Sequence, residues 1–126
     1  MPTHERPRFL DLRRVAYPPG AIASIVHRIT GVLLAIAVPF AVYAFTRSIA
    51  GPEGFAEVAA WREALAVRLA LAALVAAFAY HLLAGVRHLL LDAGVAASLR
   101  AGRRGAWLVL AAGAAALAAA VAVLLP

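Results

Sequence analysis

Three long stretches of the chain are almost entirely apolar, and polar residues are concentrated before and between them. The apolar stretches cover residues 22–46, 64–91 and 106–125, and apolar residues occupy every side of each one. A helix needs about 20 apolar residues, at about 1.5 Å each, to cross the hydrocarbon core of a bilayer. A small soluble domain could not bury helices that are apolar all round. The pattern predicts an all-α fold, an integral membrane bundle of three transmembrane helices.

The remaining segments have the composition of a surface tail and of connections. Residues 1–20 are polar, arginine-rich and interrupted by prolines, which break helices. Residues 46–62 contain a Gly-Pro-Glu-Gly run at 51–54, which favours a turn. We therefore expect a single membrane-anchor domain over residues 1–126, with a cytoplasmic tail before the first helix.

Bulk composition supports a membrane location. The 126-residue chain is 65% hydrophobic with a mean hydropathy of +0.90, whereas soluble domains are roughly 45–50% apolar. The net charge of +6 comes from twelve arginines with no lysine. Because the arginines flank the apolar stretches and form no basic stripe, they favour contacts with anionic lipid over a nucleic-acid partner. The chain has no cysteine, which excludes disulfides, thiolate catalysis and cysteine-ligated clusters within it.

The distribution of arginine predicts the orientation in the membrane. The tail and the second connection together hold seven arginines, whereas the first connection holds Arg47 and Arg62. The seven are Arg6, Arg8, Arg13, Arg14, Arg100, Arg103 and Arg104. Arginine-rich segments stay on the cytoplasmic side. We expect the N-terminus inside and, after three crossings, the C-terminus outside.

Two histidines and a glycine share one face of the second apolar stretch. His81 and His88 are seven residues apart, so on a helix they lie within about 20° of each other, with Gly85 between them. An imidazole beside a bare patch of backbone suits an axial bond to haem iron and the approach of the flat ring. His81 lies eleven residues inward from Asp92, near mid-bilayer, and His88 lies near the inner interface. The alternative is that His81 only bonds a neighbouring helix and His88 only faces headgroups.

A second polar group lies near the start of the first apolar stretch. Ser24 and Arg28 are four residues apart, with Gly31 on the same face. A hydroxyl and a guanidinium that project together suit an anionic or carbonyl-bearing ligand, such as a haem propionate or a quinone. The same residues are equally typical of a snorkelling arginine and a helix-capping serine.

The number of deep histidines points to a partner. A membrane haem held by two histidines needs a second deep imidazole. We expect only His81 at that depth, because His4, His27 and His88 are more peripheral. A second copy of the chain or another subunit would then supply the sixth ligand.

Two segments resemble the signature segments of a known family. Ser24-Ile-Val-His-Arg-Ile-Thr-Gly31 and His81-Leu-Leu-Ala-Gly-Val-Arg-His-Leu-Leu-Leu-Asp92 are similar to those of the cytochrome b subunit of succinate dehydrogenase, the large anchor subunit of respiratory complex II. The likeness extends to the tail and to residues 48–55, so it covers most of the chain.

The resemblance implies a subunit of the bacterial inner membrane that, with a second small anchor subunit, holds a flavoprotein and an iron–sulfur protein. Those soluble partners would carry the FAD and the iron–sulfur clusters and oxidise succinate, and electrons would pass to ubiquinone. Within this chain, the resemblance implies haem b with His81 as the axial ligand of the iron, and a quinone pocket that includes Ser24 and Arg28. The other haem-binding residues would be His27, Arg28, Gly85 and His88.

Two other functions are compatible with the sequence. A fumarate reductase anchor would use the same electron path in reverse, and a structural anchor without cofactor would have the same topology. A small transporter component is less favoured, because nothing in the sequence resembles paired broken helices. For docking of the soluble subunits, we expect the second connection and the basic tail with Arg13 and Arg14 to be used.

Overall fold

The computed structural model describes residues 17–95 and 98–125, and most of these residues are helical. The elements are α1 (Pro19–Ser48), α2 (Pro52–Ala60), the short 3-10 helix η1 (Trp61–Glu63), α3 (Leu65–Asp92) and α4 (Leu99–Leu124). No strand occurs within the two described ranges. The prediction of an all-α fold is confirmed.

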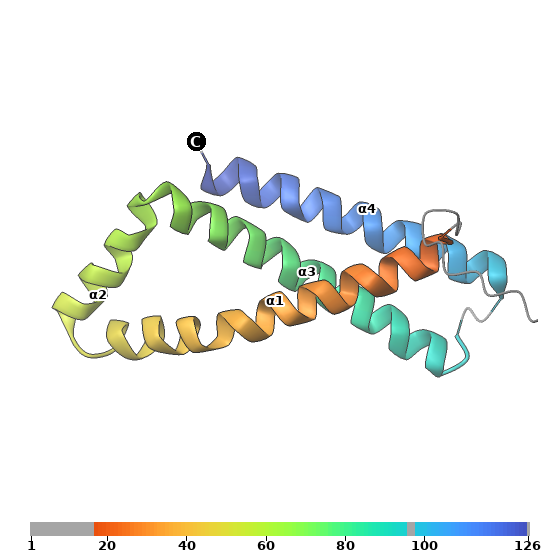
Figure 1. Cartoon of the computed structure of the whole chain (residues 1–126), viewed down its shortest axis with the longest axis horizontal. Helices are drawn as coiled ribbons and strands as arrows, with labels where there is room; N and C mark the ends of the chain where they lie inside the picture. Colours follow the sequence, from red (N-terminus) through yellow and green to blue (C-terminus); the bar gives the residue numbers. More distant parts are fainter. Residues whose placement is uncertain (1–16, 96–97, 126) are drawn as a thin grey trace, which may run out of the picture.

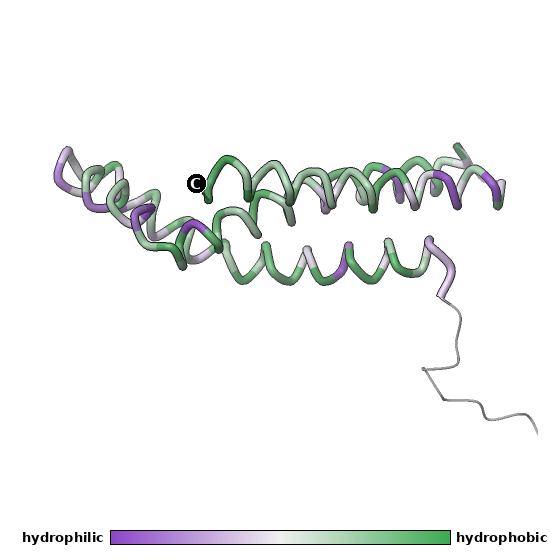
Figure 2. Tube along the Cα trace, turned by 90° about the horizontal axis from the view of Figure 1, so that it is seen from above, coloured by the Kyte–Doolittle hydropathy of each residue, from purple (hydrophilic) through white to green (hydrophobic). Residues whose placement is uncertain are grey.

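Three of these helices are long and apolar enough to cross a membrane. They are α1, α3 and α4, with 30, 28 and 26 residues. Their traces are hydrophobic over most of their length, and hydrophilic residues gather around α2 and near the helix ends (Figure 2). The three predicted membrane spans are therefore confirmed as helices of the required length and composition.

The long helices run back and forth, so the start of α1, the end of α3 and the start of α4 lie at one end (Figure 1). We call this the arginine-rich end, because it holds Arg87, Arg100, Arg103 and Arg104. There α4 packs beside α3, and α1 packs across both. At the opposite end, α2 and η1 lead from α1 into α3.

Local sequence sets the ends of the helices. α1 begins at Pro19, because proline fits the first turn, where its missing N–H costs no hydrogen bond. α4 is capped by Ser98, whose Oγ accepts a hydrogen bond at 3.3 Å from the backbone N–H three residues later. α3 ends at Asp92 in a turn completed by Gly94, whose φ of 77° favours glycine.

The largest differences between the observed helices and the expected segments are in three places. α1 begins at Pro19 instead of residue 22, and α4 begins at Leu99 instead of residue 106 because Ser98 provides a cap. The first connection contains a helix, α2, where we expect only turns. Ile49 and Ala50 form a turn, Gly51 follows with a φ of 139°, and Pro52 then starts α2. The predictions for residues 1–16 lie outside the described residues.

The interior between the helices is built mainly from small side chains, which let helix backbones approach closely. The buried apolar residues are Ala23, Ala72, Ala76, Ala77, Tyr80, Ala84, Ala106, Val109 and Ala120. Large apolar side chains face outward instead: Phe40, Leu89 and Leu108 are 70%, 71% and 70% exposed. An apolar outer surface of this extent suits lipid or another membrane subunit.

Candidate cofactor and quinone site

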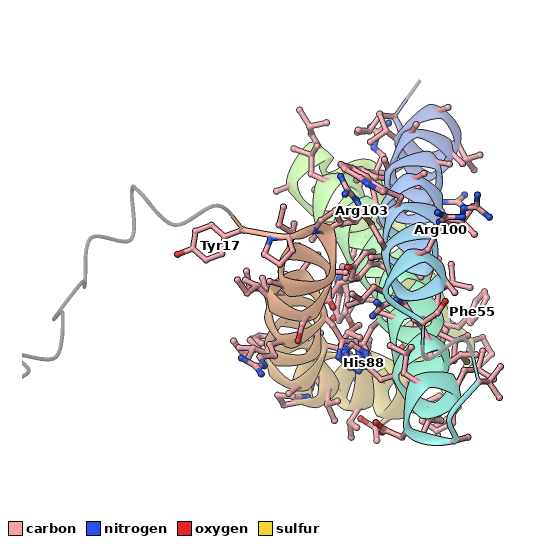
Figure 3. The ribbon with its side chains drawn as sticks, turned by 90° about the vertical axis from the view of Figure 1, so that its right-hand side faces the viewer. Tyr17, Phe55, His88, Arg100 and Arg103 are labelled. Atoms are coloured by element: carbon pink, nitrogen blue, oxygen red, sulfur yellow. The ribbon has the colours of Figure 1, made fainter. Side chains whose placement is uncertain are left out.

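Three histidine rings meet between α1 and α3. The ring of His27, on α1, stacks on that of His81, on α3, with centroids 4.1 Å apart and planes 18° apart. It also stacks on His88, with centroids 5.0 Å apart and planes 27° apart. Seen from the arginine-rich end, His88 lies in the space between these helices (Figure 3). We call His27, His81 and His88 the histidine cluster.

The hydrogen bonding of His81 defines its tautomer. Its Nδ1 lies 3.1 Å from the carbonyl oxygen of His27 and 3.3 Å from Oγ1 of Thr30. Because a carbonyl oxygen only accepts, we assign the proton to Nδ1 and the lone pair to Nε2. The Thr30 hydroxyl donates in turn to the backbone carbonyls of Val26 and His27, at 3.0 and 2.9 Å. A metal-binding histidine needs this arrangement, with one ring nitrogen donating and the other free.

The other two imidazoles are held differently. Nδ1 of His88 lies 2.7 Å from the carbonyl oxygen of Ala84, so it donates and leaves Nε2 unengaged. Nε2 of His27 is buried and has no hydrogen-bond partner. A buried polar atom without a partner costs about 1–3 kcal/mol, which makes this nitrogen a candidate contact for a bound group.

Two glycines lie against the rings. A Cβ at Gly31 would lie 2.9 Å from Cε1 of His81, so only glycine lets α1 approach this ring so closely. A Cβ at Gly85 would lie 3.6 Å from Nε2 of His27, which is ordinary van der Waals contact. The close approach of His81 to α1 therefore depends on Gly31 more than on Gly85.

Ser24 and Arg28 lie one turn apart on α1 and outside the histidine cluster. Arg28 is exposed and Ser24 is half-buried. Neither side chain forms a hydrogen bond or an ion pair with another described residue. Their hydroxyl and guanidinium are therefore available to a ligand or to a partner subunit.

Comparison with known proteins decides the family. A family model described as the succinate dehydrogenase/fumarate reductase transmembrane subunit matches residues 2–120. This chain belongs to that family. It is also similar to the succinate dehydrogenase cytochrome b556 subunit of Coxiella burnetii, with 36% identity over 111 residues that cover 83% of this chain and 85% of that protein. The resemblance predicted from the two signature segments is confirmed.

The structure of this transmembrane subunit brings His27 into contact with His81. We expect His27 to be more peripheral than His81, and its ring contacts both His81 and His88, which lies two turns further along α3. Since α1 begins at Pro19, His27 lies about two turns inside the helix. α1 also packs against α3, and the ring of His27 lies between those of His81 and His88.

Sequence reasoning assigns no role to two residues that the structure singles out. Thr30 contacts His81. The sequence could have indicated this residue, because a threonine in a spanning helix bonds a backbone carbonyl one turn back. That bond places the Thr30 hydroxyl on the same helix face as His27. Arg87 donates from Nη2 to the Gly102 carbonyl at 2.9 Å, while its Nε is buried without a partner. Arg87 and Gly102 are fifteen positions apart, so the sequence around Arg87 does not indicate this contact with α4.

The histidine cluster of this subunit fits a haem better than a bare metal ion. Within residues 17–95 and 98–125, no group of three or more histidine or carboxylate side chains is arranged to hold an ion. A haem needs only axial ligands from the protein, because the porphyrin supplies the iron's other bonds. The unengaged Nε2 of His81 and the unpartnered Nε2 of His27 are compatible with such a group.

Proposed function

We propose that this chain is the haem b-binding large anchor subunit of a succinate:quinone oxidoreductase and that it contributes to the site of ubiquinone reduction. The observation that carries the proposal is the bonding of His81. Its Nδ1 donates to α1, so Nε2 is left as a free ligand atom inside a spanning helix. The name of the Coxiella burnetii relative, a cytochrome b556 subunit, supports haem b as the cofactor.

His81 would be the axial ligand of the haem iron, and the haem would supply one-electron chemistry when bound. The residues of the chain hold and orient it. Thr30 and the carbonyl of His27 fix the ring of His81 in the tautomer that presents Nε2. His88 and Arg28 would lie beside the propionates, where the guanidinium of Arg28 offers donors to the carboxylates.

A second small anchor subunit would supply the other axial ligand. A haem held by two histidines would need each imidazole to present a free nitrogen to it. The rings of His27 and His81 face each other at 4.1 Å instead, so a porphyrin does not fit between them. Only Ala23 and Thr30 are buried along α1, which leaves a long apolar surface for a neighbouring subunit.

Ser24 and Arg28 would bind ubiquinone near the inner end of α1. The hydroxyl and the guanidinium donate hydrogen bonds to the quinone carbonyls and stabilise the negative charge that develops as electrons arrive. The exposure of Arg28 supports a pocket that is completed by partner subunits.

The arginine-rich end would face the cytoplasm in a bacterial inner membrane, following the positive-inside rule. Arg100, Arg103 and Arg104 at the start of α4 would help to dock the iron–sulfur and flavoprotein subunits. Oxidation of succinate, the FAD and the iron–sulfur clusters belong to those partners.

The haem assignment is tested by reduced-minus-oxidised absorbance spectra of the purified complex. We expect a b-type spectrum in the native protein and its loss or shift in His81→Gly, with recovery on addition of imidazole. Leu82→Ala, a change at the next and exposed position of α3, is the control and should leave the spectrum unchanged. An unaltered spectrum in His81→Gly, or a native complex without haem, contradicts the assignment.

The quinone assignment is tested separately with two electron acceptors. Ser24→Ala and Arg28→Leu should slow succinate-dependent ubiquinone reduction, while reduction of a water-soluble dye by the flavoprotein stays at the native rate. Arg62→Leu removes the same charge at the opposite end and serves as the control. Native ubiquinone reductase activity in both Ser24→Ala and Arg28→Leu would refute this part of the proposal.

A further inference from the structure

Two cavities adjoin at the arginine-rich end. The larger, about 630 Å³, lies between the starts of α1 and α4 and the end of α3, and Arg87 and Arg103 line it. The smaller, about 250 Å³, lies between α3 and α4 and is lined mainly by apolar side chains. Arg87, Leu91 and Gly102 line both cavities. A space that contains two arginines and a more apolar space therefore meet at Arg87.

The guanidinium of Arg87 is held among three glycines. Its Nη2 donates to the carbonyl oxygen of Gly102 at 2.9 Å. A Cβ at Gly105 would lie 3.4 Å from its Nε, and a Cβ at Gly20 would lie 3.8 Å from its Nη2. Its Nε is buried without a hydrogen-bond partner. The ion pairs among the described residues involve other arginines. A half-buried cation of this kind is stabilised by an anionic partner.

Arg103 adds a second guanidinium from α4. Figure 3 shows Arg103 on the side of α4 toward α1, while Arg100 points away from the bundle. Ser98 at the first turn of α4 also lines the larger cavity, where the positive end of the helix dipole adds to the two charges. The larger cavity therefore favours an anionic group.

We propose that the two cavities together bind an anionic phospholipid, with its phosphate against Arg87 and Arg103 and an acyl chain in the apolar cavity. Guanidinium groups bind phosphate oxygens through forked hydrogen bonds. The apolar cavity distinguishes a lipid from a soluble anion, because a free phosphate has nothing to place there. Its lining includes Leu83, Val86, Leu90, Val95, Leu108 and Val109.

This lipid site is distinct from the proposed haem and quinone sites. Ser24, Arg28 and the histidine cluster line neither cavity. The cavities lie where the spanning helices end, which is the level of the phospholipid headgroups. The lipid would join α1, α3 and α4 at the end where the arginines repel one another.

The test measures lipid binding to the lipid-depleted, purified complex by native mass spectrometry, with phosphatidylglycerol and with phosphatidylcholine of the same acyl chains. We expect Arg103→Gln to weaken phosphatidylglycerol binding by about tenfold, as for loss of a charge-assisted hydrogen bond. Arg100→Gln removes the same charge three residues away. Because Arg100 points away from the bundle, this variant should bind phosphatidylglycerol with native affinity. A native b-type spectrum in both variants shows that the membrane part of the complex is intact.

A second variant tests the apolar cavity without touching the arginines. Val86→Trp fills the smaller cavity, so phosphatidylglycerol binding should weaken, while binding of glycerol phosphate, which lacks acyl chains, should be unchanged. The proposal is wrong if Arg103→Gln and Arg100→Gln bind phosphatidylglycerol equally, or if phosphatidylcholine binds as tightly as phosphatidylglycerol. It is also wrong if glycerol phosphate binds as tightly as the lipid, or if a quinone or protein segment occupies the site.

Discussion

The hydroxyl of Tyr80, on α3, donates a hydrogen bond of 2.8 Å to the backbone carbonyl of Ala23, on α1, and both residues are buried. The same ring lies against α4, where a Cβ at Gly113 would overlap its Cδ2. One tyrosine thus fixes the positions of three spanning helices. Because Tyr80 immediately precedes His81, the bond also sets the level at which α1 meets the histidine cluster.

Removing this hydroxyl should loosen the contact between α1 and α3. Tyr80→Phe deletes one buried hydrogen bond, and we expect the free energy of unfolding to fall by about 0.5–1.5 kcal/mol. Tyr43→Phe is the matched control, because its hydroxyl is exposed and forms no hydrogen bond among the described residues. Thermal unfolding of the purified complex should show a lower midpoint for Tyr80→Phe only. Equal midpoints would mean that the bond adds nothing to stability.

The glycine under the tyrosine ring should be more sensitive still. Gly113→Ala places a methyl group against the Tyr80 ring, so α3 and α4 must separate, and overpacking of this kind costs about 1–3 kcal/mol. Gly102, on the same helix, has no atom within 4 Å of an added Cβ. Gly102→Ala should therefore be neutral or slightly stabilising in the same unfolding experiment. A comparable loss in both variants would show that helix propensity, not packing on Tyr80, decides the result.

Properties that depend on neighbouring residues could be predicted from the sequence. Hydropathy and length gave the three spans, and the helical period placed His81 and His88 on one face. The first connection was harder, because the glycines and proline of residues 51–54 are equally suited to a turn and to the start of a helix. Gly51 follows the turn with a positive φ, whereas Pro52 begins α2.

Contacts between distant residues could not be predicted in this way. The stacking of His27 on His81 joins residues 54 positions apart, and it depends on how α1 crosses α3. That crossing is set by Gly31, which admits the His81 ring, and by the Tyr80 bond to Ala23. None of these residues has a hydropathy pattern that reveals its partner on another helix.

The corner between α1 and α2 provides a contrast between an ion pair and a steric contact. Arg47 and Glu57 form a 2.6 Å ion pair, but their side chains are 47% and 44% exposed, so water and salt screen it. A Cβ at Gly54 would overlap the carbonyl oxygen of Arg47, which is backbone and cannot turn aside. We expect Gly54→Ala to open the corner and raise the rate of limited proteolysis there several-fold. Glu57→Gln should be cleaved at nearly the native rate. Faster cleavage of Glu57→Gln than of Gly54→Ala would mean that the ion pair, and not the steric contact, holds the corner.

Thr30 should tune the proposed haem through His81. Its Oγ1 is one of two oxygens that face Nδ1 of His81, and a hydrogen bond donated by the ligand's second nitrogen makes the ligand more basic and favours ferric iron. Thr30→Val should therefore raise the midpoint potential of the haem. The shift should not exceed about 60 mV, the one-electron equivalent of about 1.4 kcal/mol, because only one hydrogen bond is lost.

A matched threonine on α1 provides the control for the potential measured in Thr30→Val. Thr46 bonds the carbonyls of Val42 and Tyr43 at 3.0 and 2.9 Å, as Thr30 bonds those of Val26 and His27, but it has no histidine beside it. Thr46→Val should leave the potential unchanged, and Thr30→Ser should restore the native value because it keeps the hydroxyl. Redox titration of the purified complex distinguishes the outcomes. If Thr30→Val and Thr46→Val titrate at the same potential while the b-type spectrum is intact, Thr30 supports the helix and does not act on His81.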